Sequence, residues 1–170
     1  SLGNKFNQID YVIDGEGEMP LLELCNFLSE QRTTIPAQVY SQKGCDAEKK
    51  IDDIRRLDDL PMPDFLPYLD EVRQVFSDLP FMPILPVEFS RGCSWNRCTF
   101  CNLNLQWQGY RWKSAERMIA EIQELSVRTE SLNFSFTDNV LPEREMDTFF
   151  KAIIDLDHDF NFFGEIRAKT

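Results

Sequence analysis

The sequence predicts an α/β fold built from parallel strand-helix repeats. From Pro86 onward, three apolar strand-like segments alternate with two segments whose apolar residues have helical spacing. Strands that alternate with helices of this length are typical of parallel βα units. No sequence repeat of roughly 20–50 residues and no low-complexity tract favours a different architecture.

We divide the 170 residues into three parts. Residues 1–34 predict a strand, a glycine turn and a helix, residues 35–84 a connector, and residues 85–170 the βα repeats. The connector holds six of the nine prolines together with acidic pairs, a composition that favours extended chain. It also contains apolar residues such as Leu57 and Leu69, so we expect it to pack against a domain.

The first part is similar to the last βα unit of an open α/β sheet. A strand is expected over residues 10–14, Gly15 and Gly17 form a turn, and Pro20 stands in the first turn of a leucine-rich helix. Cys25 in this helix is expected to be a small buried residue. Because such turns lie where α/β folds bind ligands, Gly15 and Gly17 are candidate cofactor contacts. The alternative is that both glycines only ease a tight turn.

The third part predicts five elements in order. They are a strand over residues 86–89, a helix over 115–127, a strand over 132–136, a helix that begins after Pro142, and a strand over 160–168. Ser114 is expected to cap the first helix. The buried faces of the two helices are expected to comprise Met118, Ile119, Ile122 and Leu125, and Met146, Phe149, Phe150, Ile153 and Ile154.

Polar residues follow the strands at the edge where parallel βα folds gather their chemistry. Asp138 and Asn139 come directly after the second strand, and a cysteine-rich loop follows the first, so both are expected on one rim. Glu165 and Arg167 alternate along the third strand and therefore share a face. Two alternatives stay open: Asp138 and Asn139 cap the next helix, and Glu165 and Arg167 form an ion pair.

The charge of the chain argues against nucleic acid as a general partner. With 29 acidic and 18 basic side chains the formal net charge is −11, and phosphate binding needs clustered Lys and Arg. Residues 88–117 depart from this trend, with basic residues in excess, and would suit an anionic cofactor. The five cysteines are an odd number, and no leader or long apolar span is visible, so we expect neither disulfides nor a membrane partner. A reducing cytoplasm is the expected location.

Cys93, Cys98 and Cys101 lie within nine residues, directly after the strand over residues 86–89. Three thiolates from one short loop can hold three corners of a [4Fe–4S] cluster and leave the fourth iron open for chemistry. Phe100, between the last two cysteines, would shield such a cluster from water.

Two other uses of the cysteines remain open. A structural zinc site needs four ligands, so Cys25, Cys45 or His158 would have to be recruited from a distance. An iron–sulfur electron carrier would normally need a fourth cysteine. The local set of three favours the open cluster over a zinc module or an electron carrier.

The cysteine loop resembles the start of the radical S-adenosylmethionine (SAM) superfamily, although the usual spacing C-x3-C-x2-C is here C-x4-C-x2-C. The longer stretch over residues 89–104 is similar to the B12-binding, cobalamin-dependent radical SAM proteins, and within them to the branch that matures ribosomally made peptides (RiPPs). Residues 14–18 and 57–64 are similar to the end of that family's cobalamin domain and its connector. The resemblance implies a partial (β/α) radical-SAM-type barrel of three strands. It would be preceded by the last βα unit of a Rossmann-like B12-binding domain and the proline-rich connector.

The resemblance also implies a chemistry. The open iron would chelate the amino and carboxylate groups of SAM, and reductive cleavage would give a 5′-deoxyadenosyl radical that abstracts hydrogen from the substrate. In the cobalamin-dependent branch, a methyl group carried by cobalt is then transferred to the substrate radical. By position, Thr137, Asp138 and Asn139 would contact the SAM amino group, and Glu165 and Arg167 its ribose or carboxylate.

A complete radical SAM core has more strands than the three predicted here, so the resemblance implies a fragment that by itself neither turns over substrate nor binds cobalamin. The full-length protein would use a [4Fe–4S] cluster, SAM and cobalamin. Its partners would be an electron donor such as flavodoxin or ferredoxin and an unidentified small molecule or peptide as substrate. Open sheet edges would allow self-association.

Overall fold

The computed structural model describes residues 8–31, 33–41, 54–77, 82–101 and 109–166. The chain divides into two compact units, residues 1–54 and 55–170. The predicted connector is therefore shared between the two units. Within the described residues, no helix has the length and apolarity that crossing a bilayer requires.

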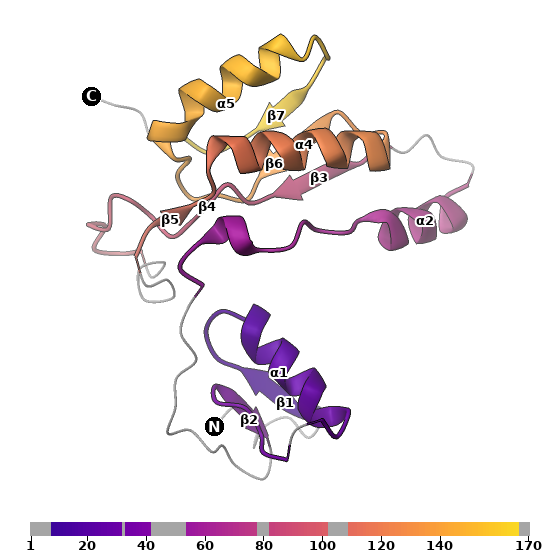
Figure 1. Cartoon of the computed structure of the whole chain (residues 1–170), viewed down its shortest axis with the longest axis vertical. Coiled ribbons are helices and arrows are strands. Elements are labelled where there is room, and N and C mark those ends of the chain that lie inside the picture. The colour runs from indigo at the N-terminus through magenta and orange to yellow at the C-terminus, as the bar shows by residue number, and fades with distance from the viewer. Residues whose placement is uncertain (1–7, 32, 42–53, 78–81, 102–108, 167–170) are drawn as a thin grey trace. The chain divides into compact units, whose positions relative to one another are not determined.

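The first unit contains β1 (Tyr11–Ile13), α1 (Glu18–Leu28) and β2 (Val39–Ser41) (Figure 1). The predicted strand, turn and helix are confirmed. The described partner of β1 is β2, which pairs with it antiparallel, whereas a Rossmann-like unit would supply a parallel neighbour. β2 was not predicted, because a strand of three residues is too short to show alternation. Cys25 is exposed on α1, so the expectation that it is buried was wrong.

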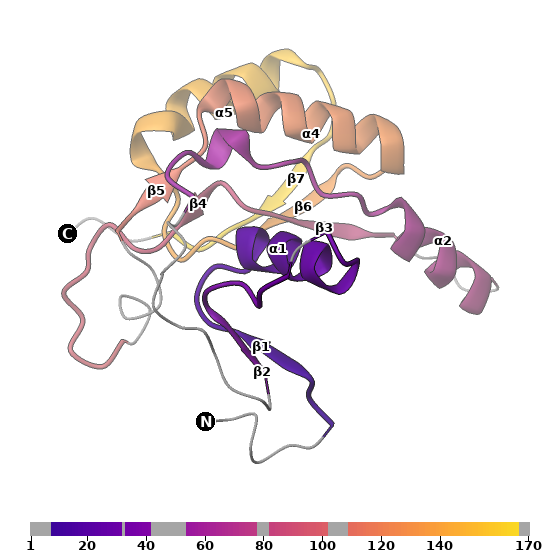
Figure 2. The ribbon, with the colours of Figure 1, turned by 60° about the horizontal axis from the view of Figure 1, so that its bottom comes forward.

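The described residues of the second unit form, in chain order, η2 (Leu57–Asp59), α2 (Leu66–Val75), β3 (Ile84–Val87), β4 (Ser90–Arg91), β5 (Arg111–Trp112), α4 (Ala115–Thr129), β6 (Asn133–Phe136), α5 (Glu143–Asp155) and β7 (Asn161–Phe163). The strands β3, β6 and β7 form a parallel sheet in that order. Figures 1 and 2 show α4 and α5 on the same side of this sheet. Right-handed crossovers that add strands in one direction produce this arrangement, which a βα barrel also needs. Three strands do not close a barrel, so the barrel stays a prediction.

The core lies between the sheet and the two helices. Leu85 and Val87 of β3 stand beside Phe134 and Phe136 of β6 in the parallel register, and all four are buried. Phe149 of α5 contacts this layer edge-on, with its ring centroid 5.9 Å from that of Phe136. Alternate residues of the strands point to the opposite face, where the described residues leave Ile84 and Phe163 exposed.

The predicted helix faces are largely confirmed. Met118, Ile122 and Leu125 of α4 are buried, and Ile119 is partly buried against the same core. Ile154 of α5 was wrongly assigned to the buried face, because its side chain is 75% exposed. The adjacent Ile153, also predicted for this face, is buried in the core.

The start of α4 is fastened by side chains from three segments. The hydroxyl of Ser114 accepts a hydrogen bond from the Arg117 N–H at 3.2 Å, so the predicted N-cap is confirmed. Asp58 of η2 accepts from the Ser114 N–H at 2.7 Å, and Glu145 of α5 accepts from the Ala115 N–H at 3.0 Å. The first N–H groups of a helix have no partner within the helix, so these contacts stabilise its start. The hydrogen bonds of Asp58 and Glu145 also connect η2 and α5 to the start of α4, next to β5.

The proline-rich segment packs against the second unit, as expected. Leu57 and Leu69 are buried, and Met62 and Phe65 lie partly buried against the core. Arg128 of α4 forms an ion pair with Asp64 at 3.0 Å. This part of the connector therefore belongs to the folded unit.

The third strand is shorter than predicted. It ends at Phe163, which pairs with Ser135 of β6, rather than continuing to residue 168. Gly164 then lies against Phe136 and Leu141, and a Cβ at this position would stand 3.2 Å from each side chain.

Candidate metal and cofactor site

The cysteine loop leaves and re-enters the fold through a two-stranded ribbon at the carboxyl end of β3. In this ribbon β4 pairs antiparallel with β5, with Ser90 opposite Trp112 and Arg91 opposite Arg111. The Lys113 N–H donates to the Phe89 carbonyl at 2.8 Å and extends the pairing by one hydrogen bond. The loop that carries the cysteines is thus closed at its base. The ribbon was not predictable from the sequence, because each strand has only two residues.

Two glycines allow the strands of the ribbon to part. Gly92 has φ +92° and Gly109 has φ +84°, a region that residues with a Cβ rarely adopt. A Cβ on Gly92 would stand 2.5 Å from the Gly109 carbonyl oxygen, closer than such atoms can approach. Gly92 is therefore required both by its conformation and by the close passage of the returning chain.

Asp138 anchors the ribbon to the end of β6. One carboxylate oxygen accepts a hydrogen bond from the Phe89 N–H at 3.0 Å, and the other accepts from the Ser90 N–H. The side chain is buried, and burial raises the pKa of its carboxyl to about 6, although both hydrogen bonds act in the opposite direction. The ribbon and the loop after β6 are therefore held together by a nearly inaccessible carboxylate.

The Val140 carbonyl makes a second connection between the same segments. It accepts hydrogen bonds from the Ser90 hydroxyl at 2.7 Å and from the Tyr110 hydroxyl at 2.9 Å. Burial raises the pKa of Tyr110, and Asp138 and Cys93 add to the rise through their negative charge. The Val140 carbonyl thus joins both strands of the ribbon region to the loop after β6.

Cys93, Cys98 and Cys101 are all free thiols. Cys98 is exposed, and the other two are partly accessible. Within the described part of the chain, no three side chains of His, Cys, Asp or Glu are already gathered around a metal position. Three accessible soft donors on one loop nevertheless match, in number and chemistry, what a cluster with one open iron requires. The donor set therefore fits the group that the sequence implied.

The surroundings of the cysteines differ from the expectation in two ways. Phe100 is 90% exposed, so its ring is not packed against the described residues of the loop, and shielding of a bound cluster stays a prediction. The excess of basic residues is largely paired: Arg91 binds Glu88 and Lys113 binds Glu121, each at 2.8 Å. Arg97 lies within the loop itself, with its guanidinium 5.3 Å from the Trp95 ring centroid.

The structure places the distant zinc candidates as follows. His158 packs its ring against Phe160 just before β7, at the amino end of the strand, whereas the cysteine loop follows the carboxyl end of β3. Cys25 belongs to the first unit, and Cys45 lies outside the described residues. A zinc site that combines His158 with the loop cysteines would need a different fold of this unit.

The five predicted SAM contacts stay predictions. Thr137 is exposed at the carboxyl end of β6, where its N–H donates to the Val87 carbonyl at 2.9 Å, and Asn139 is half-buried beside Asp138. Both oxygens of Asp138 are engaged by backbone N–H groups, so its observed role is structural. Glu165 is exposed beyond β7, and Arg167 lies outside the described residues.

The two glycines of the first unit differ from each other. Gly15 has φ +86°, and a Cβ there would stand 3.1 Å from the side-chain nitrogen of Gln38, so the turn itself requires a glycine. Gly17 precedes α1 with an ordinary φ of −84°, and a Cβ would meet no described atom within 4 Å. The tight-turn alternative therefore accounts for Gly15 and does not account for Gly17. Their predicted cofactor contacts stay predictions.

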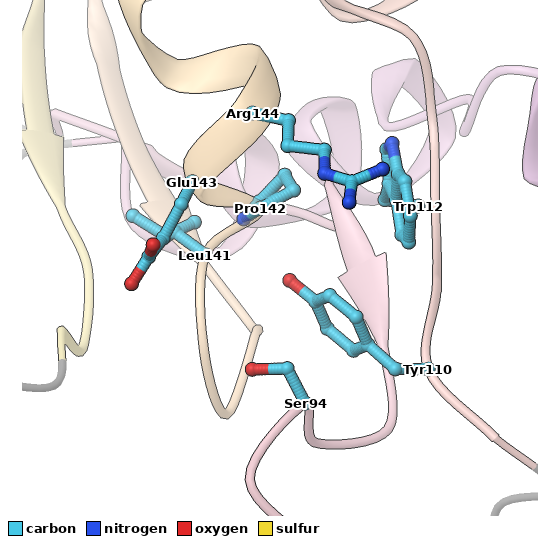
Figure 3. A pocket seen from close by; sticks show the side chains of 7 residues that line it. All are labelled: Ser94, Tyr110, Trp112, Leu141, Pro142, Glu143 and Arg144. Atoms are coloured by element: carbon cyan, nitrogen blue, oxygen red, sulfur yellow. The ribbon is translucent and has the colours of Figure 1, made fainter.

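A pocket that the sequence analysis missed lies beside the cysteine loop. It encloses about 320 Å³ between Ser94, the β5 region and the start of α5, and Figure 3 shows its lining: Ser94, Tyr110, Trp112, Leu141, Pro142, Glu143 and Arg144. Tyr110 and Trp112 are two residues apart, and their ring centroids are 5.4 Å apart. That spacing was the available signal, since alternate residues of an extended segment share a face.

The comparisons with known proteins bear on this fold. No family model matches the sequence. An uncharacterized methyltransferase of Pyrococcus horikoshii is 34% identical over 138 residues, which cover 77% of this chain and 28% of that protein. A solved cobalamin-dependent SAM radical enzyme, OxsB, with aqua-cobalamin and SAM bound, has a TM-score of 0.68 at 18% identity, covering 95% of this chain and 24% of that enzyme. The fold is similar to part of a radical SAM enzyme. The chain spans about a quarter of the length of each of these two proteins.

Proposed function

We propose that this chain is part of a cobalamin-dependent radical SAM methyltransferase and carries the loop that binds its [4Fe–4S] cluster. The observation that carries the proposal is the set of three free thiols on a loop fixed at the carboxyl end of the first strand of a parallel βα sheet. The fold likeness to OxsB and the sequence likeness to a named methyltransferase support it. Modification of a peptide, as in the RiPP branch, is the finer form of the proposal.

In this proposal Cys93, Cys98 and Cys101 hold the cluster as thiolates, and Arg97 on the same loop offsets part of its negative charge. The bound cluster would supply the electron that cleaves SAM. Thr137, Asp138, Asn139, Glu165 and Arg167 are proposed to orient SAM.

The chain's own contribution is to fix the loop. The Asp138 carboxylate holds the N–H groups of Phe89 and Ser90, and Gly92 lets the loop turn away from the ribbon. A loop with a fixed base presents its three thiols from one side of the sheet rim, which is the positioning that a cofactor enzyme must supply. Gly15 and Gly17 are proposed as cobalamin contacts in the whole protein, where an electron donor such as flavodoxin or ferredoxin would serve the cluster. The exposed edges of β3 and β7 are the proposed route to self-association.

The first test is anaerobic reconstitution of the protein with iron and sulfide, followed by electron paramagnetic resonance of the reduced sample with and without SAM. We expect a [4Fe–4S] signal that shifts when SAM is added. Cys98→Ala is expected to lose the signal, and Cys25→Ala is the matched control because Cys25 is a free, exposed thiol outside the loop. Stoichiometric zinc without labile sulfide would contradict the proposal in favour of a zinc module. A cluster with four cysteine ligands and no response to SAM would indicate an electron carrier.

A further inference from the structure

The pocket beside the cysteine loop has one apolar side and one cationic side. Tyr110, Trp112, Leu141 and Pro142 supply apolar surface, and Arg144 supplies a guanidinium. In Figure 3 the Arg144 side chain extends over the pocket toward Trp112, while the Glu143 carboxylate lies on the other side of Pro142. A ligand could therefore meet the cation without also meeting the carboxylate.

Arg144 has no partner among the described residues. Arg91, Arg117 and Arg128 all form ion pairs, as expected in a chain with 29 acidic residues. The guanidinium of Arg144 forms neither an ion pair nor a hydrogen bond with the described part of the protein. An unpaired guanidinium beside two aromatic rings is arranged to receive an anion, because its planar fork matches a carboxylate through two parallel hydrogen bonds.

The apolar lining limits the rest of the ligand. The Tyr110 and Trp112 rings are suited to a flat or branched apolar group, and about 320 Å³ is at the small end of ligand pockets. Only a small molecule, or one residue of a larger one, would fit. Arg144 is the one cationic side chain among the described residues of the lining, so it matches the single negative charge of a carboxylate, whereas the second negative charge of a phosphate would have no cationic partner among them.

We propose that the pocket formed by Tyr110, Trp112 and Arg144 is a subsite that binds a carboxylate attached to a flat apolar group, and that it holds part of the substrate beside Cys93. Ser94, which lines the pocket, is the next residue after Cys93, so a bound ligand lies next to the cysteine loop. The assignment of the ligand as substrate rests on the proposed function. The binding of a carboxylate to this pocket does not depend on the proposed function.

The probe for the test is phenylacetate, titrated into the cluster-free protein while the indole N–H signals of tryptophan are followed by nuclear magnetic resonance. The Trp112 signal, assigned with Trp112→Phe, is expected to shift, because its indole nitrogen donates to Glu145 at 3.3 Å beside the pocket. We expect Arg144→Gln to weaken phenylacetate binding at least tenfold and Arg144→Lys to weaken it less. Arg73→Gln, the control at an exposed arginine of α2, should leave the affinity unchanged.

Ligand analogues sharpen the test. Phenylacetamide, the neutral analogue, is expected to bind at least tenfold more weakly than phenylacetate, and phenyl phosphate no more tightly. N-acetylphenylalanine imitates the carboxyl end of a peptide, so tighter binding than phenylacetate supports the subsite with a peptide as ligand, and weaker binding supports it with a small molecule. Equal binding of acid and amide, unchanged affinity in Arg144→Gln, or no shift of Trp112 would each overturn the subsite. Failure of cluster assembly with phenylacetate binding intact would instead contradict the proposed function alone.

Discussion

The Asp138 carboxylate accepts a hydrogen bond at 3.0 Å from the backbone N–H of Phe89, which lies 49 positions earlier in the chain. This contact joins the end of the second parallel strand to the point where the chain leaves the first. The same carboxylate also binds the N–H of Ser90, the first residue of the ribbon. The base of the cysteine loop is therefore fixed by a residue that lies outside the loop.

Asp138 gives the stability of the protein a distinct pH dependence. Its pKa is about 6 in the folded protein against 3.8 for a free aspartate, so the folded state binds the proton more tightly than the unfolded state. The Asp138 contribution to stability therefore falls as pH rises through this window. Between about pH 5 and pH 7.5, the free energy of unfolding should fall by about 1 kcal/mol relative to that of Asp138→Asn. Urea denaturation at several pH values measures this difference, and a difference that stays constant or grows with pH would contradict the burial of a charged group here.

Replacement of Gly92 tests the closure of the ribbon. Gly92→Ala combines an unfavourable φ with a Cβ only 2.5 Å from the Gly109 carbonyl oxygen, so we expect it to destabilise the protein by about 2 kcal/mol or more. Gly109→Ala has a similar φ and no contact within 4 Å, and it should cost only about 1 kcal/mol. Thermal unfolding of the two variants separates the cost of the unfavourable φ, which both share, from the cost of the steric clash, which only Gly92→Ala has. Equal losses would mean that the strands do not pass as closely as the structure places them.

The buried ion pair between Lys113 and Glu121 gives the third prediction. The two side chains are 4% and 0% exposed, with Nζ 2.8 Å from Oε2. Lys113→Met leaves the Glu121 carboxylate buried without its main partner, so we expect a loss of about 3 kcal/mol in the free energy of unfolding. The double variant Lys113→Met with Glu121→Leu should recover most of it, because it removes both buried charges.

Chemical denaturation of the single and double variants checks this prediction. Arg73→Met removes the exposed pair with Asp70 and serves as the control, with an expected change below about 0.5 kcal/mol. A double variant that is no more stable than Lys113→Met would show that Glu121 is not the source of the loss.

Alkylation provides a test of the cysteines that is independent of activity. In the metal-free protein iodoacetamide should modify Cys98 and Cys25 readily, since both are exposed. After cluster assembly, Cys93, Cys98 and Cys101 should be protected while Cys25 stays reactive, because coordinated thiolates are poor nucleophiles towards the reagent. Mass spectrometry of the digested protein quantifies each site. Protection of Cys25 together with the loop cysteines would point to nonspecific metal binding.

Sequence periodicity predicted α4, α5 and β6, because each buries one regular face, but it did not predict the ten-residue helix α2 in the segment expected to be extended. Ser114 was identifiable as a cap from its position before that pattern. The ribbon of β4 and β5 was not predictable, since two residues per strand carry no periodicity and their pairing spans the whole cysteine loop. The end of β7 at Phe163 depends on pairing with β6, a distant segment, and residues 160–168 alone do not contain this information.

The residues of the candidate site also fall into those that the sequence could identify and those that it could not. The three cysteines are recognisable by spacing alone, because a local ligand set is a property of neighbouring residues. The structural role of Asp138 and the pocket beneath Arg144 arise from contacts between distant segments. Asp138 was singled out for its place after a strand, but its hydrogen bonds to Phe89 and Ser90 could only be found once the strands were side by side.

The ribbon also makes the length of the cysteine loop independent of the sheet. The pairing of Ser90 with Trp112 fixes where the cysteine loop begins and ends. A residue added between Cys93 and Cys98 is therefore expected to lengthen the loop without moving β3 or α4. The four-residue gap between these cysteines is therefore compatible with an unchanged scaffold. By the same reasoning, we expect that loops with other cysteine spacings could be grafted onto this ribbon, provided that Ser94 keeps its place in the lining of the pocket.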